Sequence, residues 1–420
     1  MPLRKVLGLR DLVFYGLGVI FGAGIYVLIG DAAGMAGNTV WMSFVIAAVV
    51  ATFTGLSYAE LSSMYPRDAA EYTYVKKAFR AKSAGFVAGW LTTATVILAA
   101  AVVSLGFGKY LNALTGINPI IAAAGLILLF SFINYLGIRA SSRINIVLTS
   151  ITVLGLLLII AIGVPNWGSI DYFNSPTGIA GTVGAATLIF FAYLGFDEIV
   201  NVSEEAKGAR KNVPKAIVIS IIISTVVYIL VAVSAISTVP WQALGESNTP
   251  LALVAQTALG GSTNFLLSIF ALFATASTTL IFMLAGSRML FGMAEVHAMP
   301  SVLKKLGRHQ TPYAAIAIIG AMALLAISAN MADIALLVDF GAFAIFAMIN
   351  LSAFALRFSE PDAKREFRTP LSIGRAPILP LLGFLVSCYM LTQFSTQIAW
   401  ASVAIMIAGY MFYKFCEAGK

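Results

Sequence analysis

The sequence predicts an all-α integral membrane protein that crosses the bilayer twelve times. Hydrophobic residues make up 60% of the 420-residue chain, charged residues make up 10%, and the mean hydropathy is +0.93. Soluble domains carry about 25% charged residues, so this chain has too few charges to cover a surface that faces water. Apolar runs of roughly 20 residues, each long enough to span a bilayer core, recur along the whole sequence.

The predicted spans follow one another without a Pro/Ser-rich linker or a soluble insertion, which favours a single membrane domain over residues 1–420. They lie at residues 12–36, 39–64, 83–111, 118–137, 144–164, 179–205, 214–238, 262–292, 312–330, 333–356, 376–394 and 397–416.

The distribution of positive charge predicts the orientation of these spans. With both termini in the cytoplasm, nearly all of the 26 Lys and Arg residues fall in cytoplasmic segments, and the exceptions are Lys109 and Arg288. Membrane topology and contact with anionic lipids therefore explain the net charge of +8 better than nucleic-acid binding does. We expect a multi-pass protein of the cell membrane.

The first span carries an interruption at Gly22-Ala23-Gly24. Glycines in membrane helices often serve close helix packing, and the GxxxG pair of Gly18 and Gly22 fits that role. Two glycines around one alanine also weaken the helix in mid-span. The sequence therefore favours an unwound stretch whose free N–H groups, at the start of a second half-helix, can bind a carboxylate.

A second interruption is predicted in the sixth span, at Phe190–Phe196 around Gly195. Unwound carbonyls at this point can accept hydrogen bonds from an ammonium group. Asp197 and Glu198 follow directly, and a carboxylate inside a transmembrane segment suggests a functional role such as gating or coupling. For Asp197, a structural bond to a neighbouring helix or to a freed backbone N–H is the alternative.

The two interrupted spans open two blocks of five spans, at residues 11–164 and 179–357. Because each block has an odd number of spans, the second block enters the membrane from the opposite side, and the repeat is inverted. Interrupted spans at corresponding positions of two such repeats predict a binding site near the bilayer midplane. The two spans left over, at residues 376–416, are expected to be peripheral.

Two further groups of polar residues lie inside predicted spans. Glu60, near the inner end of the second span, is expected to pair with a nearby base such as Arg67 or Arg80, as a gate or as a structural tie. In the eighth span, Ser277 and Thr278 can bond to the carbonyl one turn earlier, or they can contribute oxygen ligands to a Na⁺ site. No other metal or cofactor is expected.

These motifs together resemble the amino acid–polyamine–organocation (APC) superfamily of permeases, near its amino acid permease and cationic amino acid transporter branches. The similarity extends over most of the chain and is densest at GAGIYVLIG (22–30), SYAELSSMYPRDAAEYTYVKKAF (57–79) and FFAYLGFDEIVNVSEEAKGARKNVPKAI (190–217). The resemblance implies a LeuT-type fold, in which five helices are repeated in inverted order, helices 1 and 6 are broken, and two peripheral helices follow.

By position in these motifs, the resemblance also implies a substrate site. A substrate carboxylate would meet the backbone of the first break, and an ammonium group would meet carbonyls of the second, beneath the Phe191 ring. The implied residues are Ile20, Gly22, Ala23, Gly24, Phe191, Ala192 and Leu194. Many relatives carry a lysine in the fifth helix, and Thr152 takes its place here.

The sequence therefore predicts a secondary amino acid transporter that works by alternating access rather than an enzyme, because no nucleophile–base pair or metal cluster is found in it. A channel is less well supported, because it would need a pore lined by rings of carbonyls or charges. Symmetric subunits usually supply such rings, whereas this chain is asymmetric and has paired helix breaks. The same motifs are also compatible with a proton-coupled amino acid or polyamine permease and with a transporter-like nutrient sensor. The sequence does not identify a protein partner.

The expected substrate has a neutral side chain. Relatives that carry cationic substrates commonly have a carboxylate in the third helix near a Gly-Trp pair, whereas no acidic residue lies between Trp90 and Asp171 here. Transport is expected to be Na⁺-coupled symport or obligatory exchange (antiport), because no lysine in the fifth span fills the place of a sodium ion. A proton carried by Asp197 or Glu198 is the competing account.

Overall fold

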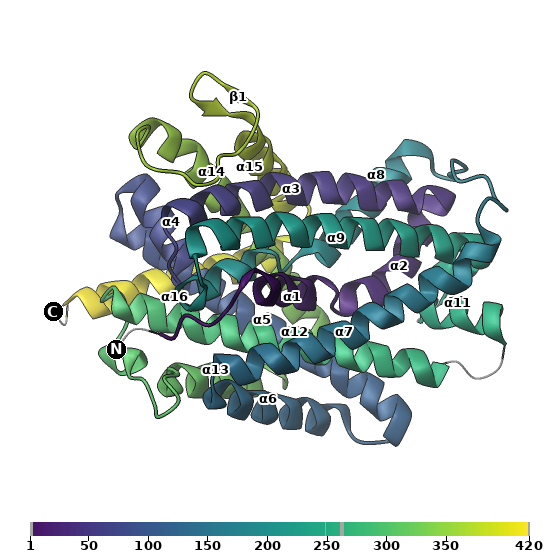
Figure 1. The fold of residues 1–420 in the computed structure, drawn as a ribbon, viewed down its shortest axis with the longest axis horizontal. Helices are drawn as coiled ribbons and strands as arrows, with labels where there is room; N and C mark the ends of the chain where they lie inside the picture. The colour runs from purple at the N-terminus through teal and green to yellow at the C-terminus, as the bar shows by residue number, and fades with distance from the viewer. Residues whose placement is uncertain (1–2, 248, 261–263, 419–420) are drawn as a thin grey trace.

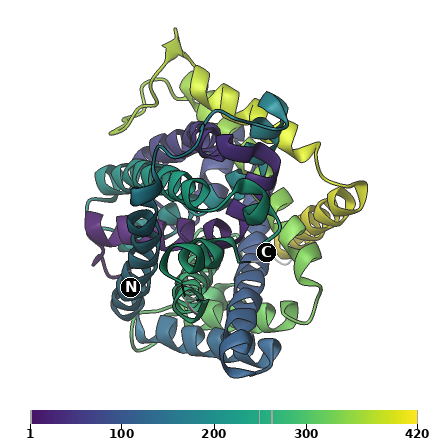
Figure 2. The same cartoon turned by 90° about the vertical axis from the view of Figure 1, so that its right-hand side faces the viewer.

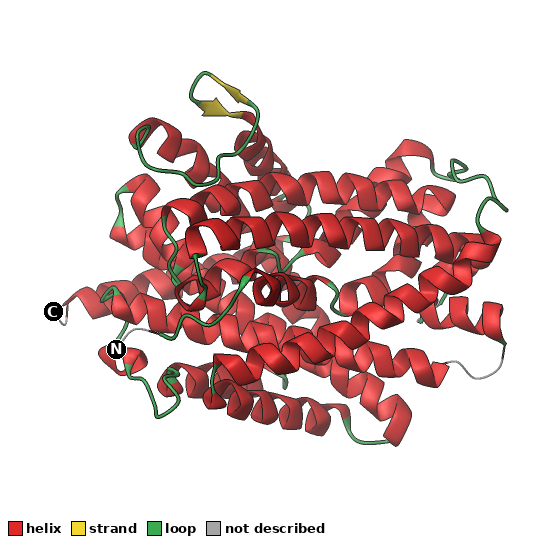
Figure 3. Ribbon diagram, in the orientation of Figure 1, coloured by secondary structure: helices red, strands yellow, loops and turns green. Residues whose placement is uncertain are grey.

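The computed structural model describes residues 3–247, 249–260 and 264–418. Most of this part of the chain is helical, and Figure 3 shows the small hairpin of β1 (Ser372–Ile373) and β2 (Ala376–Pro377) standing out from the helices. The two strands are antiparallel, with Ser372 opposite Pro377 and Ile373 opposite Ala376.

The α-helices form a bundle of mostly long elements. They are α1 (Leu9–Ile20), α2 (Ala23–Ala36), α3 (Val40–Met64), α4 (Ala70–Phe79), α5 (Lys82–Thr115), α6 (Pro119–Leu136), α7 (Ile138–Gly163), α8 (Gly178–Phe190), α9 (Ala209–Thr238), α10 (Trp241–Gly245), α11 (Pro250–Leu259), α12 (Asn264–Glu295), α13 (Tyr313–Ala326), α14 (Met331–Ser359), α15 (Ile378–Leu391) and α16 (Thr396–Ala418). Short 3₁₀ helices are η1 (Gly37–Thr39), η2 (Val164–Asn166), η3 (Phe191–Tyr193), η4 (Asp197–Glu205) and η5 (Ser301–Lys304).

Local sequence accounts for several of these helix ends. The side chain of Asn118 accepts a hydrogen bond from the Ile120 N–H, with Pro119 in the first helical position of α6. Asn330 caps α14 in the same way, by accepting from the N–H groups of Ala332 and Asp333. Gly116 follows α5 with a φ of +77°, a left-handed conformation that glycine adopts readily at the end of a helix.

The described part of each predicted span coincides with helical structure, and residues 262 and 263, where the eighth span is predicted to begin, lie outside the described residues. Ten helical stretches in the described part are long and apolar enough to cross a membrane. The spans predicted at 312–330 and 376–394 correspond to α13 and α15, which have 14 residues each. Fourteen helical residues extend about 21 Å, less than the thickness of a bilayer core. Apart from the small hairpin, the regular structure of the described residues is helical, and the long apolar helices indicate a multi-pass membrane protein.

The long helices run roughly along one axis of the molecule, with α1 at its centre (Figure 1). There α1 packs against α7, α9 and α12, and its second half is buried. The segment that leads into α1 and the end of α16 lie at the same end of the bundle, on the left of Figure 1. Viewed toward one end of the bundle, the hairpin segment stands away from the other elements (Figure 2).

Candidate functional site

The first helical break lies between α1 and α2, at Phe21 and Gly22. Gly22 occupies the N-cap position of α2 with no side-chain hydrogen bond, so no capping side chain accepts from the first N–H groups of this half-helix. A Cβ atom at Gly22 would lie 2.6 Å from the Thr278 hydroxyl oxygen, so the backbone approaches α12 closely. The break therefore presents bare backbone at the start of a helix, where the helix dipole favours an anion.

The second break separates α8 from η4. After η3, Leu194 is extended (φ −60°, ψ 141°) and Gly195 has a φ of +118°. That φ lies in a region that side chains disfavour, so a glycine is required here. The Leu194 N–H donates to the Phe191 carbonyl over 3.1 Å, which closes the single turn of η3 before the chain unwinds.

The two breaks touch each other through their glycines. A Cβ atom at Gly24 would lie 3.1 Å from the Ala192 Cα atom, and one at Gly195 would lie 2.2 Å from a methyl carbon of Val19. Residues about 170 positions apart in the sequence are thus in direct contact. A side chain at Gly195 would require Val19 to move, and one at Gly24 would require Ala192 to shift by a few tenths of an ångström.

Tyr228, on α9, joins the two breaks through its hydroxyl group. The hydroxyl donates to the Ile20 carbonyl at the end of α1 and lies 3.0 Å from the Ala192 carbonyl in η3. Its ring packs edge-to-face on Phe21, with ring centroids 5.6 Å apart. Sequence reasoning missed this residue, although a tyrosine in the middle of an apolar span is a signal because its buried hydroxyl must find a partner.

A cavity lies where the breaks meet, and its walls are almost entirely apolar. Six of the predicted substrate-binding residues line it, namely Ile20, Gly22, Gly24, Phe191, Ala192 and Leu194. The side chain of Ala23 lies outside the described part, and its backbone begins α2. The remaining lining residues are Val19, Ala99, Val102, Val103, Thr278, Phe282, Ala335 and Val338, so no charged side chain from the described residues lines this cavity.

Oxygen atoms from three helices converge beside the cavity, around Gly18. The Ser277 hydroxyl donates to Asn145 Oδ1 over 2.8 Å and lies 3.1 Å from the Thr149 hydroxyl. Thr278 donates to the Gly18 carbonyl over 3.1 Å and also lies 3.1 Å from the carbonyl one turn earlier, at Ala274. Neutral hydroxyl, amide and carbonyl oxygens of this kind can coordinate a small hard cation.

The position predicted for the fifth-helix lysine is one turn away from this cluster. Thr152 donates to the Leu148 carbonyl and accepts from Tyr26 through its own carbonyl. Thr149, one turn before Thr152 on α7, is the residue whose hydroxyl lies 3.1 Å from the Ser277 hydroxyl. The structure thus places Thr149 and Asn145, rather than Thr152, next to α1 and α12.

Asp197 and Glu198 do not line the cavity. Asp197 accepts a hydrogen bond from the Gly195 N–H over 3.0 Å, which is the bond to a freed backbone group that the sequence left as an alternative. Glu198 is buried, and its carboxylate accepts from the Asn201 amide over 3.0 Å. Both acids lie beyond the second break, in η4.

Two more buried acids lie close to η4 but outside the membrane-spanning stretches. Glu71, on α4, accepts from the Tyr58 hydroxyl over 3.1 Å, and burial raises the pKa of its carboxyl group to about 8. Asp68 accepts from the Glu204 N–H over 2.7 Å, and burial again raises its pKa above the ordinary value. Sequence reasoning missed both because they lie in an apparent loop.

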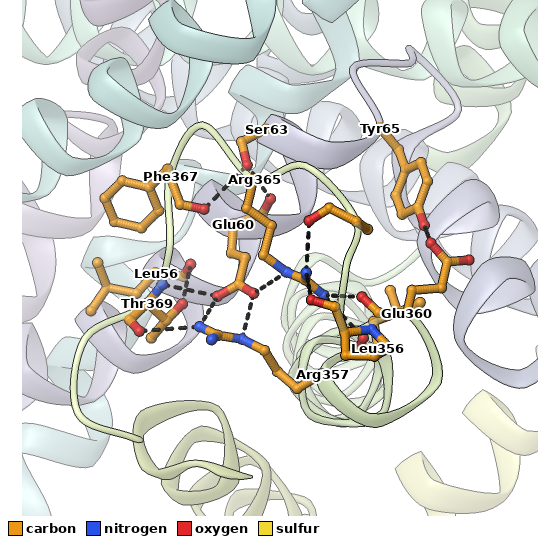
Figure 4. A network of polar contacts seen from close by, with 12 residues as sticks. Leu56, Glu60, Ser63, Tyr65, Leu356, Arg357, Glu360, Arg365, Phe367 and Thr369 are labelled. Atoms are coloured by element: carbon orange, nitrogen blue, oxygen red, sulfur yellow. Dashed lines mark hydrogen bonds and ion pairs between the residues drawn. The ribbon is translucent and has the colours of Figure 1, made fainter. Parts of the chain in front are cut away.

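The predicted pairing of Glu60 with a nearby base is wrong. Its partners are Arg357 at the end of α14 and Arg365 in the following loop, and neither predicted base, Arg67 or Arg80, pairs with it (Figure 4). Arg357 donates to Glu60 over 2.7 Å, Arg365 donates over 3.0 Å, and the Thr369 N–H adds a bond of 2.9 Å. The network ties α3 to the segment between α14 and α15. Arg67 pairs with Glu204 instead.

A second buried ion pair joins η4 to α12, where Arg288 meets Glu205 at 2.9 Å with both side chains almost fully buried. The backbone carbonyl of Glu205 also accepts from the N–H groups of Val6 and Leu7, and the Lys207 N–H donates to Leu7. The segment before α1, η4 and α12 are thereby held together. These contacts lie at the end of the bundle at which the chain enters α1.

The sequence of the chain is similar to those of known transport proteins. The family model for amino acid permeases matches residues 7–413. The branched-chain amino acid permease of Bacillus subtilis (strain 168) is 30% identical over 96% of this chain and 90% of its own length. The methylthioribose transporter of the same organism is 29% identical over 97% and 92%, and cationic amino acid transporter 4 of Mus musculus is 28% identical over 97% and 72%.

Proposed function

The chain belongs to the amino acid permease family, and from that premise we propose that it is a secondary transporter of neutral amino acids that works by alternating access. The observation that carries this proposal is the apolar cavity between two contacting helix breaks. Its uncharged walls suit an aliphatic side chain, because a buried ammonium or guanidinium group without a partner is unfavourable inside a membrane.

The breaks supply opposite polarity for the two charged ends of an amino acid. The start of α2 presents N–H groups to the α-carboxylate, and the unwound stretch after α8 presents carbonyls to the α-ammonium group. The Phe191 ring and the side chains from α5, α12 and α14 would then surround the apolar part of the substrate. The name of one relative, a branched-chain amino acid permease, supports a leucine-like substrate.

We propose further that the twelve predicted spans form the LeuT-type arrangement within a single membrane domain over residues 1–420. Residues 11–164 and 179–357 would be the inverted repeats, and residues 376–416 the two added helices. The contact between the first and second breaks supports this pairing of repeats. The distribution of Lys and Arg supports cytoplasmic termini. It also supports location of the protein in the cell membrane, in contact with lipid.

Uptake of labelled leucine into proteoliposomes tests the proposed function. We expect leucine uptake that unlabelled leucine inhibits and that lysine, leucine methyl ester and methylthioribose inhibit at least tenfold less well. Equal inhibition by the methyl ester would contradict recognition of the carboxylate, and stronger inhibition by lysine would contradict the neutral substrate. Saturable binding without uptake would indicate a nutrient sensor.

Gly24 offers a sharper test of the site itself. A Cβ atom at Gly24 would lie 3.1 Å from the Ala192 Cα atom, whereas one at Gly34, on the same helix, would lie 3.4 Å from its nearest neighbour, Gly245. We expect Gly24→Ala to weaken leucine binding and Gly24→Val to abolish it, while Gly34→Ala leaves it unchanged. Undiminished binding in Gly24→Val would place the substrate elsewhere.

Coupling to Na⁺, or obligatory exchange, is the proposed energy source, and the oxygen cluster around Gly18 supports it. In a Na⁺ gradient, Ser277→Ala should reduce uptake, because Ser277 lies between Asn145 and Thr149. Thr279→Ala is the matched control, since Thr279 donates within its own helix to the Thr275 carbonyl, and its other contact, from Ser104 on α5 over 3.5 Å, lies outside the oxygen cluster. Uptake that follows a pH gradient, ignores Na⁺ and survives Ser277→Ala would favour proton coupling.

A further inference from the structure

A second cavity lies on the other side of Phe191, which we call the side pocket. Phe191, Leu194 and Ala335 line both this pocket and the cavity between the breaks. The walls come from α2, α8, α14, α15, α16 and the segment that joins α15 to α16, and they are mostly apolar. Its other lining residues are Leu28, Met35, Gly184, Thr187, Leu188, Leu336, Asp339, Phe343, Met390, Gln393, Phe394, Ser395 and Ile398.

Asp339 is the one acidic side chain among these lining residues. Its Oδ1 atom is buried and has no hydrogen-bond partner in the described part of the chain. No Lys, Arg or His lines the pocket among the described residues, so the protein itself supplies no opposite charge there. The function proposed above does not use this residue.

An unpartnered carboxylate inside a membrane span is unfavourable, and such groups are usually compensated by a counter-charge. A ligand cation can provide that charge if it is small enough to reach Oδ1 and apolar enough to fill the rest of the pocket. A primary ammonium group on a short aliphatic body meets both conditions. Leu336, Phe343 and Phe394 would pack on the aliphatic part.

We propose that the side pocket binds small aliphatic primary amines, with Asp339 as the residue that accepts from the ammonium group. The pocket differs chemically from the cavity between the breaks, where backbone groups meet both ends of the substrate and a carboxylate on the ligand is required. An amine without a carboxylate therefore binds the side pocket alone. Because Phe191 and Leu194 form a shared wall, a bound amine also hinders transport through the neighbouring cavity.

The part of this proposal that concerns transport rests on the proposed function, whereas amine binding does not. The probe is isopentylamine, which is leucine without its carboxylate, and isopentyl alcohol is its uncharged counterpart. Isothermal titration calorimetry on the purified full-length protein should show binding of the amine and not of the alcohol. Asp339→Asn should weaken amine binding at least tenfold, because an amide keeps the shape of the side chain but carries no charge.

Asp333→Asn is the matched control, because Asp333 is an exposed acid on the same helix. This variant should bind isopentylamine like the wild type. Gly24→Val should lose leucine binding and keep amine binding, which separates the two sites. Unfolding midpoints measured alongside show whether Asp339→Asn keeps its fold, and Asp339→Glu, which restores the charge, should regain part of the amine affinity.

Absence of amine binding in the wild type, equal affinity in Asp339→Asn, or loss of amine binding in Gly24→Val would each overturn the proposal. In transport assays, isopentylamine should inhibit leucine uptake in the wild type and not in Asp339→Asn. If the wild type takes up no leucine yet binds the amine through Asp339, the proposed function fails while the side pocket stands.

Discussion

At the scale of single residues, Tyr228 connects the two breaks that make the candidate site. One hydroxyl group reaches the Ile20 carbonyl at the end of α1 and the Ala192 carbonyl in η3. Both carbonyls lie at points where the regular helical hydrogen bonds stop. The tyrosine thus stabilises the unwound backbone on both sides of the cavity.

Tyr228→Phe should therefore weaken substrate binding while the protein stays folded. Loss of the donor leaves buried carbonyls without a partner, which costs about 1–3 kcal/mol and corresponds to about a tenfold to hundredfold loss of affinity. Tyr193→Phe is the control, because its hydroxyl bonds to the Phe44 carbonyl on α3 and not to both breaks. Equal effects on leucine binding in the two variants would show that Tyr228 has no special role.

A second single residue, Glu71, makes the stability of the protein depend on pH. Burial raises the pKa of its carboxyl group to about 8 from an ordinary 4.5, so the folded state binds the proton more tightly than the unfolded state. The stabilisation by this proton is complete below the unfolded-state pKa and is lost as the pH rises toward the folded-state value.

The midpoint temperature of thermal unfolding of the wild type should accordingly decrease as the pH is raised from 5 to 8.5. In Glu71→Gln this decrease should be smaller. Asp362→Asn removes an exposed carboxylate and should leave the pH dependence unchanged. Thermal unfolding of the purified protein across this range is the measurement. Parallel curves for the wild type and Glu71→Gln would show that Glu71 does not hold a proton in the folded state.

At the scale of elements, the segment between α14 and α15 is fastened to α3 by charge. Glu60, Arg357 and Arg365 are 2%, 3% and 7% exposed, so one buried carboxylate serves two buried guanidinium groups. Breaking a buried ion pair by removing one partner costs about 3–5 kcal/mol, because the other charge stays buried without compensation.

Glu60→Gln should release this segment and lower the stability of the protein. We expect a lower unfolding midpoint and faster cleavage by trypsin after Lys364 or Arg368, which lie in the segment. Glu366→Gln disrupts an exposed ion pair with Lys364 in the same segment and should have little effect on stability. Unchanged trypsin cleavage in Glu60→Gln would mean that the backbone alone holds the segment in place.

At the scale of the whole molecule, contacts at the end where the chain enters α1 join the segment before α1, η4 and α12 to one another. The Arg288–Glu205 pair joins α12 to η4, and the segment before α1 bonds to the backbone of Glu205 and Lys207. A transporter that works by alternating access must break these contacts when it opens on this side. In the proposed alternating-access cycle, we therefore expect their strength to set the balance between the two states.

Glu205→Gln should shift that balance toward states open at this end. Loss of about 3 kcal/mol changes a population ratio by roughly a hundredfold. With Cys388 and Cys416 replaced by Ser, Ala99→Cys in the cavity wall can report access to an impermeant maleimide. Labelling from the side of the N-terminus should become faster, and labelling from the opposite side slower.

Glu204→Gln provides the control for this experiment, because Glu204 forms a more exposed pair with Arg67. It should leave both labelling rates close to those of the parent protein. Identical rates in Glu205→Gln and Glu204→Gln would show that the buried pair does not govern opening.

The sequence alone determined the class of the protein and the position of its two breaks. Hydropathy and helix-breaking glycines are local properties, so Gly22–Gly24 and Phe190–Phe196 could be recognised without knowledge of the packing. Six of the seven implied substrate-site residues also line one cavity, because the motifs that resemble the family include both breaks.

Only the tertiary structure decided which side chains meet across the bundle. Glu60 pairs with Arg357, 297 positions away, and not with a nearby base, because α3 lies beside the end of α14. Tyr228, Thr149 and Asp339 likewise acquire their surroundings from the rotation and depth of each helix. Hydropathy places a helix in the membrane, but it leaves that rotation undetermined, so long-range polar contacts depend on packing.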